Sequence, residues 1–255
     1  MAETTLAVEA QGLVRRFGDF TAVDGVDLAV PAGSFYGFLG PNGAGKSTTI
    51  KCLTGLLQPT AGALRLLGLD PQAHPVEVRR RVGVVPEGLA LLERLSAAEM
   101  LDFVGQVHGL PARERGRRRD ELLALMDLAE TGDALVADFS HGMRKKLALA
   151  AALLPGPRLL FLDEPFEGVD AVAARQFKEL LTAYVRRGNT VFLTSHVLEI
   201  VERLCDRVAV IARGRIVAEG RTNELRADSG GGRSLEQVFV ELVGGDRAAA
   251  HLDWL

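Results

Sequence analysis

The sequence predicts an α/β fold whose sheet is mostly parallel, with an N-terminal antiparallel β layer and an inserted all-helical subdomain. Three observations support this class. Continuously apolar segments at 34–39, 158–163 and 190–194 are typical of strands buried on both faces of a parallel sheet. Residues 22–30 alternate apolar and polar side chains, which is the period of a half-buried strand. Over 96–128 the apolar period becomes helical, which indicates the insertion.

The other elements follow from local signals taken in order. Residues 6–10 and 13–14 favour a strand before a turn at Arg15–Gly18. Ser96-Ala97-Ala98-Glu99 matches a capping box, and Gly109-Leu110-Pro111 divides the insertion into two helices. Further helices are predicted over 48–57, 76–81, 144–154, 171–187 (with Asp170 as its cap), 197–204 and 234–242, the last after a glycine-rich break at 228–232. Further strands are predicted over 61–68, 82–85, 207–211 and 215–217.

Composition limits the class of protein. The chain has 255 residues, 47% of them hydrophobic and 25% charged, which fits one α/β domain with an inserted subdomain. A net charge of −3 does not indicate a nucleic-acid partner, so no nucleic acid is expected. The basic cluster interleaved with acidic residues is interpreted as a solvated helix face, with a nucleic-acid site as the alternative. That cluster comprises Arg113, Arg115, Arg117, Arg118 and Arg119.

The cysteines and the apolar runs indicate the cellular setting. Cys52 and Cys205 form no disulfide or metal pattern, so a reduced, cytoplasmic setting is expected. The first residues lack the basic and apolar regions of a signal peptide. The longest apolar run, 147–154, is too short to span a bilayer. We therefore expect that the chain itself does not cross a membrane, although it can dock onto a protein that does.

The segment Gly40-Pro41-Asn42-Gly43-Ala44-Gly45-Lys46-Ser47-Thr48 reads G-x-x-x-x-G-K-S, the phosphate-binding loop. Its glycines let successive backbone N–H groups point at an anion, and the following helix adds its partial positive charge. Lys46 can reach the β- and γ-phosphates, and the Ser47 hydroxyl can ligate Mg²⁺. With a strand predicted before it and a helix after it, the motif indicates a P-loop NTPase core rather than a glycine-rich turn that happens to contain lysine.

Polar residues also follow two other predicted strands. Ligands of an open parallel sheet sit beyond the carboxyl ends of its strands, so these residues and the phosphate loop are expected to share one crevice. Asp163 is the expected second holder of Mg²⁺, opposite Ser47. Glu164 is placed to accept a proton from water attacking the γ-phosphate, and His196 to donate a hydrogen bond to that phosphate and orient the water. The alternatives are a capped strand end for the carboxylates and a core position for the histidine.

Taken in order, these motifs resemble the nucleotide-binding subunit of an ABC transporter over about residues 6–243. The resemblance implies ATP and Mg²⁺ as cofactors. It implies that Phe17 stacks on adenine, although a core residue at a strand end is the alternative for this aromatic. The signature motif is matched by Phe139-Ser140-His141-Gly142-Met143, whose Ser140 and Gly142 would contact the γ-phosphate across a dimer.

The resemblance also assigns two loops. Asp170 matches the aspartate of the loop after the strand carboxylates, and His196 matches the switch histidine. Glu87 matches a residue, usually Gln, that senses Mg²⁺ and the attacking water and faces the membrane partner.

Three residues depart from the family pattern. His141 replaces the first signature glycine, Met143 replaces a Gln, and Glu87 replaces the other Gln. His141 costs backbone freedom if its position needs a positive φ. The run Ser-His-Gly-Met-Arg-Lys-Lys and the segment 234–242 are nevertheless similar to the ABC-2 export branch of the family.

The expected function is an ATPase that dimerises on ATP, as a homodimer or heterodimer, and powers export through a separate ABC-2-like membrane permease. It would then lie peripherally on the cytoplasmic face of the membrane. A soluble ATPase scaffold of the iron–sulfur-assembly kind and a regulatory subunit with little turnover are the alternatives. The expected subdomains are a nucleotide-binding core of 1–87 and 156–225, a helical signature subdomain of 88–155, and a C-terminal helix and tail of 226–255.

Overall fold

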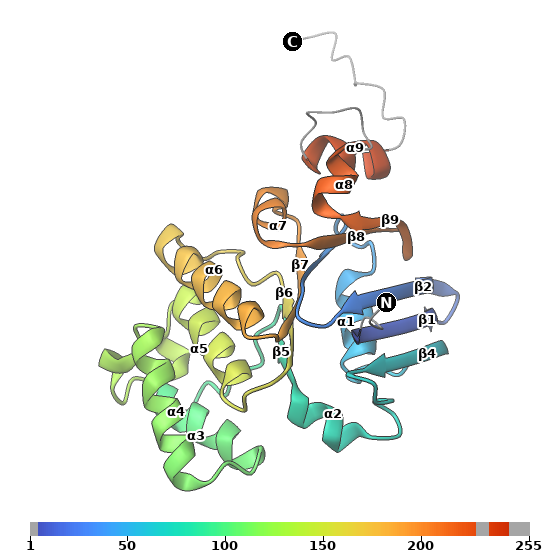
Figure 1. Ribbon diagram of the computed structural model, residues 1–255. Helices are drawn as coiled ribbons and strands as arrows, with labels where there is room; N and C mark the ends of the chain where they lie inside the picture. Colours follow the sequence, from blue (N-terminus) through green and yellow to red (C-terminus); the bar gives the residue numbers. More distant parts are fainter. Residues whose placement is uncertain (1–4, 228–234, 245–255) are drawn as a thin grey trace.

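A six-stranded sheet in the order β5-β6-β7-β3-β8-β9 forms the centre of the molecule (Figure 1). The computed structural model describes residues 5–227 and 235–244. The strands of this sheet are β3 (Phe35–Leu39), β5 (Val82–Val85), β6 (Leu159–Asp163), β7 (Thr190–Ser195), β8 (Arg207–Ala212) and β9 (Arg215–Arg221). The first five are parallel and β9 returns antiparallel to β8, so the predicted mostly parallel sheet is confirmed.

The apolar strands of this sheet separate two hydrophobic layers. Every residue of β3, β6 and β7 is buried. Successive side chains of a strand point to opposite faces, and in β6 this places Leu160 and Leu162 in one cluster and Leu159 and Phe161 in the other. The first cluster lies against the helices, and the second lies against a separate sheet.

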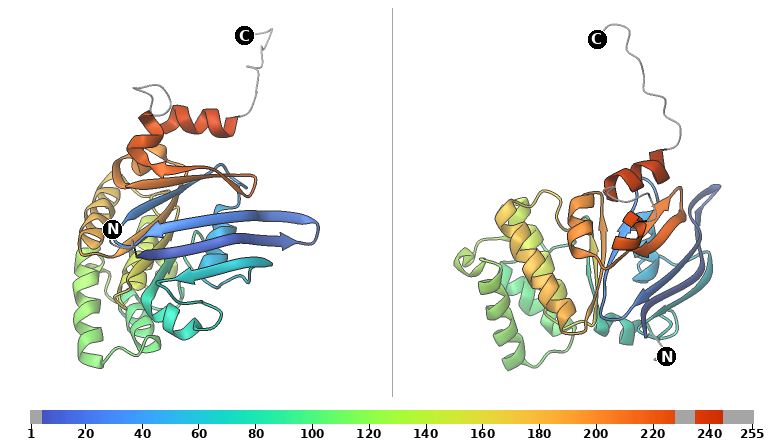
Figure 2. Two further views of the ribbon diagram at one scale, coloured as in Figure 1. Left: turned by 45° about the vertical axis from the view of Figure 1, so that its right-hand side comes forward. Right: turned by 45° about the horizontal axis from the view of Figure 1, so that its top comes forward.

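That separate sheet has three antiparallel strands in the order β2-β1-β4 (Figure 2). Its strands are β1 (Leu6–Phe17), β2 (Phe20–Pro31) and β4 (Ala61–Leu66). The predicted antiparallel layer is thus confirmed, but the expected turn at Arg15–Gly18 is wrong. Shifts in the β1–β2 register let the strand continue to Phe17, and the hairpin turns at Gly18, where φ is 56°.

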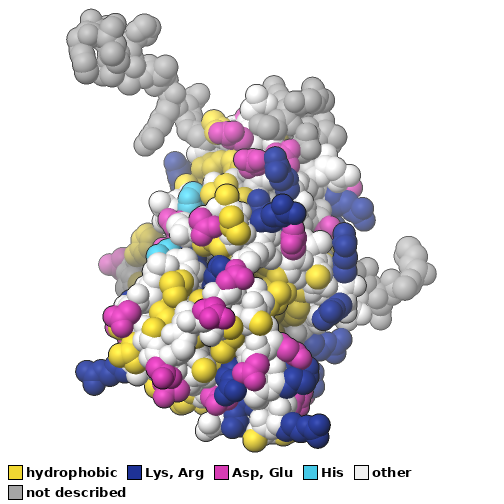
Figure 3. Space-filling model, turned by 90° about the vertical axis from the view of Figure 1, so that its left-hand side faces the viewer, with side chains coloured by type: hydrophobic (Ala, Val, Ile, Leu, Met, Phe, Trp, Pro, Cys, Tyr) yellow, Lys and Arg dark blue, Asp and Glu magenta, His cyan; other side chains and the backbone are white. Residues whose placement is uncertain are grey.

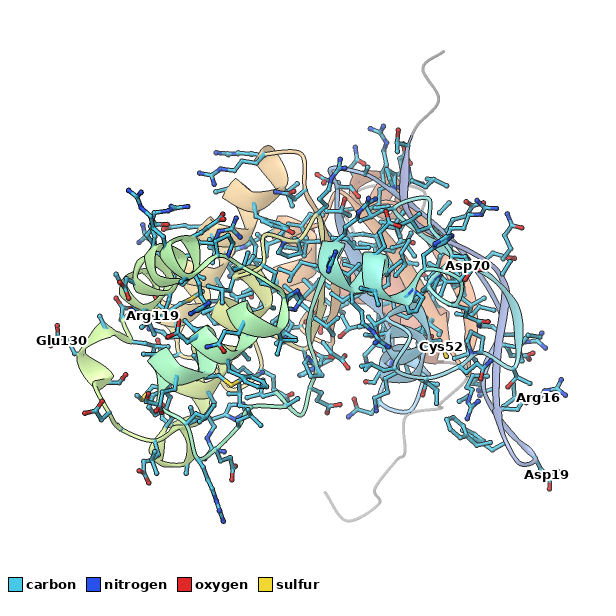
Figure 4. All side chains as sticks on the ribbon, turned by 90° about the horizontal axis from the view of Figure 1, so that it is seen from below. Arg16, Asp19, Cys52, Asp70, Arg119 and Glu130 are labelled. Carbon is cyan, nitrogen blue, oxygen red and sulfur yellow. The ribbon has the colours of Figure 1, made fainter. Side chains whose placement is uncertain are left out.

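Helices cover the other face of the central sheet, and most belong to the insertion. These are α3 (Ala97–Val107), α4 (Ala112–Leu125), the short 3₁₀ turns η1 (Ala129–Thr131) and η2 (Val136–Asp138), and α5 (His141–Leu153). Figure 4 shows Arg119 and Glu130 on this helical side of the molecule, with Arg16 and Asp19 near the tip of the β1–β2 hairpin on the opposite side. The predicted capping box is present, because the Ser96 and Glu99 side chains each bond the backbone of the other.

The basic cluster of the insertion is paired with carboxylates. Arg117 contacts Glu121, and Arg118 contacts Glu114, one helical turn away on α4 in each case. The face that the helices present carries charges of both signs with hydrophobic side chains between them (Figure 3). Arg117 is 60% exposed, as expected of a solvated helix face. Arg115, Arg118 and Arg119 are only 19–28% exposed and also bond Asp102 of α3 or the Leu154 carbonyl, so they join α4 to its neighbours.

The remaining helices are α1 (Lys46–Leu53), α2 (Pro75–Arg81), α6 (Ala171–Arg186), α7 (Leu198–Leu204), α8 (Thr222–Ala227) and α9 (Leu235–Gly244). Helix α1 was expected to reach Leu57 but ends at Leu53. The Thr54 hydroxyl donates to the Ile50 carbonyl at 2.8 Å, and Gly55 turns the chain with φ 71°. Helix α8 was not predicted. The predicted break at 228–232 lies outside the described residues, as does Ser234.

Two further facts concern the cysteines and the membrane. Cys52 and Cys205 are both free and buried. Burial raises the pKa of the Cys52 thiol to about 11 and raises that of Cys205 as well. In the described part of the chain, no helix has the length and apolar character that crossing a bilayer requires.

Candidate functional site

The phosphate loop joins β3 to α1, where the sequence places it. Gly45 has φ 109°, and an added Cβ there would lie 2.5 Å from the Ala22 carbonyl oxygen. At Gly40 an added Cβ would collide with the Ile211 carbonyl. Glycine is therefore required at both positions by backbone neighbours, and the loop is fixed against β2 and β8. Such a loop presents its N–H groups inward, which is the arrangement that holds phosphate.

Lys46, the first residue of α1, is 7% exposed. Its Nζ donates to the carbonyl of Gly40 at 2.7 Å and to that of Pro41 at 3.3 Å. The same nitrogen lies 3.7 Å from Glu164 Oε1. Ser47 and Thr48 follow and are partly exposed, whereas Asn42 and Gly43 at the loop tip are exposed. Lys46 thus contacts both the phosphate loop and Glu164, the residue that follows β6.

The two carboxylates at the end of β6 are held by the neighbouring strand β7. Thr194, which is fully buried, donates its hydroxyl to Asp163 Oδ1 at 2.6 Å. The same hydroxyl accepts the backbone N–H of Glu164 at 3.0 Å. Glu164 adopts φ 49°, a left-handed conformation that non-glycine residues seldom take outside functional sites. The turn directs its side chain toward the phosphate loop, and both carboxylates are more than 90% buried.

His196 follows β7 and completes the contact. Its Nδ1 lies 2.9 Å from Glu164 Oε2, and its backbone N–H donates to that oxygen at 3.2 Å. The side chain is 48% exposed, so the core-histidine alternative does not hold. With Glu164 ionised, Nδ1 carries the proton toward it, which leaves Nε2 to interact with a ligand. The three strand ends therefore meet through Lys46, Glu164 and His196.

A second buried lysine reaches the same carboxylate residue from the helical side. Lys145 of α5 is 5% exposed, and its Nζ donates to the backbone carbonyl of Glu164 at 2.7 Å. Burial lowers the pKa of Lys145, while the nearby charges of Glu167, Glu164 and Glu87 act in the opposite direction. The sequence analysis missed both Lys145 and Thr194. The one available signal was the helical spacing of Lys145 from the apolar residues Ala148, Leu149 and Ala152.

The remaining predicted site residues lie apart from this cluster. Ser140 is exposed at the N-terminus of α5, where its Oγ accepts the Met143 N–H at 3.2 Å. Asp170 caps α6, as expected, by accepting the N–H groups of Val172 and Ala173 at 2.9 Å each, and these bonds, that from Ala173 foremost, lower its pKa. Among the described residues, no recorded hydrogen bond or ion pair joins Ser140, Gly142 or Asp170 to Lys46, Asp163 or Glu164.

With this geometry established, known proteins can be compared. The sequence model of the ABC transporter family matches residues 23–167. The chain belongs to the ABC transporter family. This confirms both the predicted fold class and the predicted resemblance to the family's ATP-binding subunits.

Individual ABC proteins are similar along most of the chain. The daunorubicin resistance ATP-binding protein DrrA3 of Streptomyces coeruleorubidus is 42% identical over 91% of this chain and 73% of its own length. The Nod factor export ATP-binding protein I of Ralstonia nicotianae is 40% identical over 87% of this chain and 69% of its own length. A solved ATP-binding subunit of an ABC transporter superposes with a TM-score of 0.87 at 33% identity, covering 93% of this chain and 99% of that one.

The structure places two of the departures from the ABC pattern, His141 and Glu87, as follows. His141 is the first residue of α5 and is absent from the positive-φ residues of the described chain, so the replacement of glycine there imposes no left-handed strain. Its ring packs against Gly168, where an added Cβ would lie 2.9 Å from His141 Cδ2. Glu87 lies after β5 and is exposed. Its charge acts on Lys145, which places the carboxylate near the joint between β5 and α5.

Phe17, the ABC residue expected to meet the base, ends β1 and is 46% exposed. The core-residue alternative therefore does not hold. The Arg15 guanidinium lies 4.4 Å from the ring centroid, a cation–π distance, and its Nη1 donates to the Gln58 carbonyl at 2.9 Å. The ring is thus supported by a neighbouring cation while retaining exposed surface.

Proposed function

We propose that this chain binds ATP with Mg²⁺, hydrolyses it to ADP and phosphate, and powers export through a separate membrane permease. The observation that carries the proposal is the contact of Lys46, Glu164 and His196 beside a glycine-enforced phosphate loop. A positively charged group, a carboxylate and an imidazole placed together beyond parallel strands suit the hydrolysis of a phosphoanhydride.

The residues present fit both cofactors. The loop of residues 40–48 offers N–H groups and a lysine to phosphates, and Phe17 offers an aromatic face to a base. Ser47 and Asp163 supply the hard oxygen ligands that Mg²⁺ prefers. No group of three or more His, Cys, Asp or Glu in the described part of the chain could hold a metal alone, which suits an ion whose other ligands are phosphate oxygens and water. When bound, Mg²⁺ would supply charge neutralisation at the phosphates.

The chain's own residues then divide the work. Glu164 accepts the proton of the attacking water, because its carboxylate is buried and held by Lys46 and His196. His196 is oriented by Glu164, so that its Nε2 can donate to a phosphate oxygen when the ring is protonated. Lys46 exchanges its loop carbonyls for phosphate oxygens. In this proposal Glu87, which is exposed after β5, senses the metal and the attacking water and faces the permease.

Glu164→Gln tests the hydrolytic role directly. The variant should bind ATP like the wild type and lose on the order of 10²–10⁴-fold in Mg²⁺-dependent turnover, the usual contribution of a positioned base. Glu179→Gln is the matched control, because Glu179 is exposed on α6 and paired with Arg175. Unchanged turnover in Glu164→Gln would remove this residue from the role. Wild-type protein that binds ATP without turnover would favour the regulatory-subunit alternative.

We further propose that ATP brings two such chains together, as a homodimer or with a related subunit. Ser140 and Gly142 lie at the free N-terminus of α5, whose N–H groups and positive dipole end attract an anion, yet they touch no group of their own chain's cluster. Head-to-tail pairing would place these residues, with Asp170, over the partner's ATP and close as a two-fold dimer. Sizing of Glu164→Gln protein should show a dimer with ATP and a monomer with ADP.

The export role rests on a surface of the insertion. In this proposal residues 88–155 move relative to the core of 1–87 and 156–225, and the residues from 226 onward add a C-terminal helix and tail. A cavity of about 320 Å³ lies where β5, α3 and α5 meet, and Pro86, which precedes Glu87 in the chain, lines it. Phe103 and Val107 of α3 are 47% and 68% exposed on this subdomain. These features suit an ABC-2-like permease, and the relatives named for drug resistance and Nod factor export support the direction.

Co-expression tests the permease and the location together. A membrane protein encoded next to this chain, with several ~20-residue apolar spans, should retain it on the cytoplasmic face of vesicles and raise its ATPase activity. Lack of any association, with turnover intact, would favour the soluble-scaffold alternative.

A further inference from the structure

Lys145 stands out because a lysine is buried where an apolar residue would fit. Its surroundings are mostly hydrophobic, with Leu149 of the same helix, Leu162 of β6 and Phe177 of α6 around a void of about 10 Å³ that Asp163 also lines. Such a void holds about one water molecule at most. Burying a cation in these surroundings costs more than burying a hydrophobic residue of similar volume. Packing alone therefore does not account for the lysine.

Lys145 donates a hydrogen bond to Glu164, the site residue whose backbone is in the left-handed region. Its Nζ donates to the Glu164 carbonyl at 2.7 Å, while the Glu164 N–H donates to Thr194 Oγ1 at 3.0 Å. Glu164 is therefore held on both sides of its Cα in a conformation with φ 49°. Left-handed backbone at a non-glycine residue persists only where its surroundings impose it. The Thr194 contact comes from the sheet, and the Lys145 contact comes from the helix that begins with the signature motif.

We infer that Lys145 is a positioning residue that fixes the catalytic conformation of Glu164 and ties it to helix α5. The inference rests on the proposed role of Glu164 as the base. Because Ser140 caps the same helix, a shift of α5 displaces the donor to the Glu164 carbonyl. Closure of a second subunit over Ser140 and alignment of the base are then linked through a single helix. Glu87 departs from the family pattern by carrying a negative charge. Lys145 is a cation on which that charge acts.

Lys145→Met is the decisive variant, since it keeps an unbranched side chain only one atom shorter and removes the charge and the donor. Replacing a buried cation by a hydrophobic residue is commonly neutral or stabilising, so the melting temperature should stay the same or rise. Meanwhile kcat should fall roughly 10- to 100-fold, the scale of a misplaced catalytic group, with KM and ATP affinity unchanged. Lys145→Arg, which keeps a cationic donor, should retain a higher kcat than Lys145→Met.

Lys146→Met is the matched control. It removes the adjacent lysine of the same helix, whose Nζ pairs with Asp127 at 2.9 Å instead. This variant should keep wild-type kcat. A Lys145→Met protein with wild-type kcat, or one that loses ATP affinity in step with kcat, would overturn the inference. If Glu164→Gln retains full turnover, the proposed function fails instead, and the two results are distinct.

Hydrogen exchange gives a reading that does not depend on turnover. Amides of residues 164–168 should exchange faster in Lys145→Met than in wild type or Lys146→Met, because the Glu164 peptide loses one of its two anchors. Equal exchange in all three proteins would show that Lys145 does not hold this turn.

Discussion

The two parts of the molecule that carry site residues differ in how those residues are held. In the α/β core, Lys46, Asp163 and Glu164 are buried and bonded to one another or to neighbouring strands. In the helical insertion and the loop leading into α6, Ser140 and Asp170 are exposed and bond only the first turns of their own helices.

The difference shows which contacts one chain can complete. Parallel strands bring their carboxyl ends together as a consequence of folding, so one chain is sufficient to form the contacts of the core cluster. The N-terminus of α5, which carries the signature motif, is also regularly folded. It faces outward, and its backbone N–H groups can bind an external ligand. Lys145 is the exception, since it belongs to α5 and bonds a residue of the core cluster.

Among the variants that test this comparison, the largest effect is expected from a change in the exposed signature end of α5. Ser140→Arg places a bulky cation at the start of α5 and should lower turnover on the order of 10²-fold, as does loss of one preorganised donor at a transition-state charge. Binding of ATP to the monomer should persist, since the core cluster is untouched. Glu130→Arg, at the outer edge of the helical side, is the control (Figure 4). A Ser140→Arg protein that still dimerises with ATP would place this serine outside the interface.

The next largest effect is expected when a buried hydrogen bond of the core cluster is removed. Thr194→Val keeps the shape of the side chain but deprives Asp163 and the Glu164 N–H of their shared partner. Unfolding in denaturant should show a loss of about 1–3 kcal/mol, the penalty for stranded buried polar groups, together with reduced turnover. Thr190→Val is matched, because Thr190 on the same strand accepts the Gly33 N–H at 2.9 Å. Thr190→Val should lower the free energy of unfolding by a similar amount but leave the kcat of the folded protein unchanged. Equal losses of kcat in the two variants would show that Thr194 has no specific role in positioning the carboxylates.

Phe17 differs from the other site residues of the α/β core because its side chain is exposed. It therefore tests whether an exposed residue of the core also binds the nucleotide. An aromatic face discriminates little among bases, so Phe17→Ala should weaken ATP and GTP by similar amounts, ~1–3 kcal/mol by analogy with stacking on nucleic acids. Calorimetry can measure both affinities. Phe103→Ala removes a ring of nearly equal exposure, 47% against 46%, from α3 and should change neither. Unaltered affinities in Phe17→Ala would rule out the stacking role.

The smallest effect is expected at the capping box of α3. Ser96→Ala removes the hydroxyl that accepts the Glu99 N–H, and should cost about 1 kcal/mol of stability. Thermal unfolding can measure this loss. Since the Ser96 side chain bonds Glu99 of its own helix, ATP affinity should not change. An affinity change would mean that the insertion and the core are coupled more broadly than through Lys145.

Sequence reasoning succeeded where neighbours in the chain are neighbours in space. The phosphate loop is one continuous segment, and the carboxylates follow directly from the apolar strand β6, so both could be placed before folding was known. Lys145 and Thr194 could not, because each meets Glu164 across 19 and 30 positions of sequence. In the run Arg144-Lys145-Lys146 three adjacent basic residues look alike in sequence, and only tertiary packing buries the middle one to 5% exposure. The end of α1 and the whole of α8 were missed for a local reason, since short helices carry too few periods to be recognised.

The buried cysteines give this protein a practical advantage for trapping experiments. Thiolate is the reactive form, and a thiol with a pKa of about 11 is almost entirely protonated at neutral pH. Cys52 and Cys205 are both also shielded from reagents. A pair of new cysteines, one replacing Asn42 at the exposed loop tip and one replacing Glu130 or Ser140 on the insertion, can therefore be joined by a bifunctional maleimide in the native background. The spacer length that joins chains across the Asn42–Ser140 pair, but not the Asn42–Glu130 pair, would measure the approach of two subunits directly.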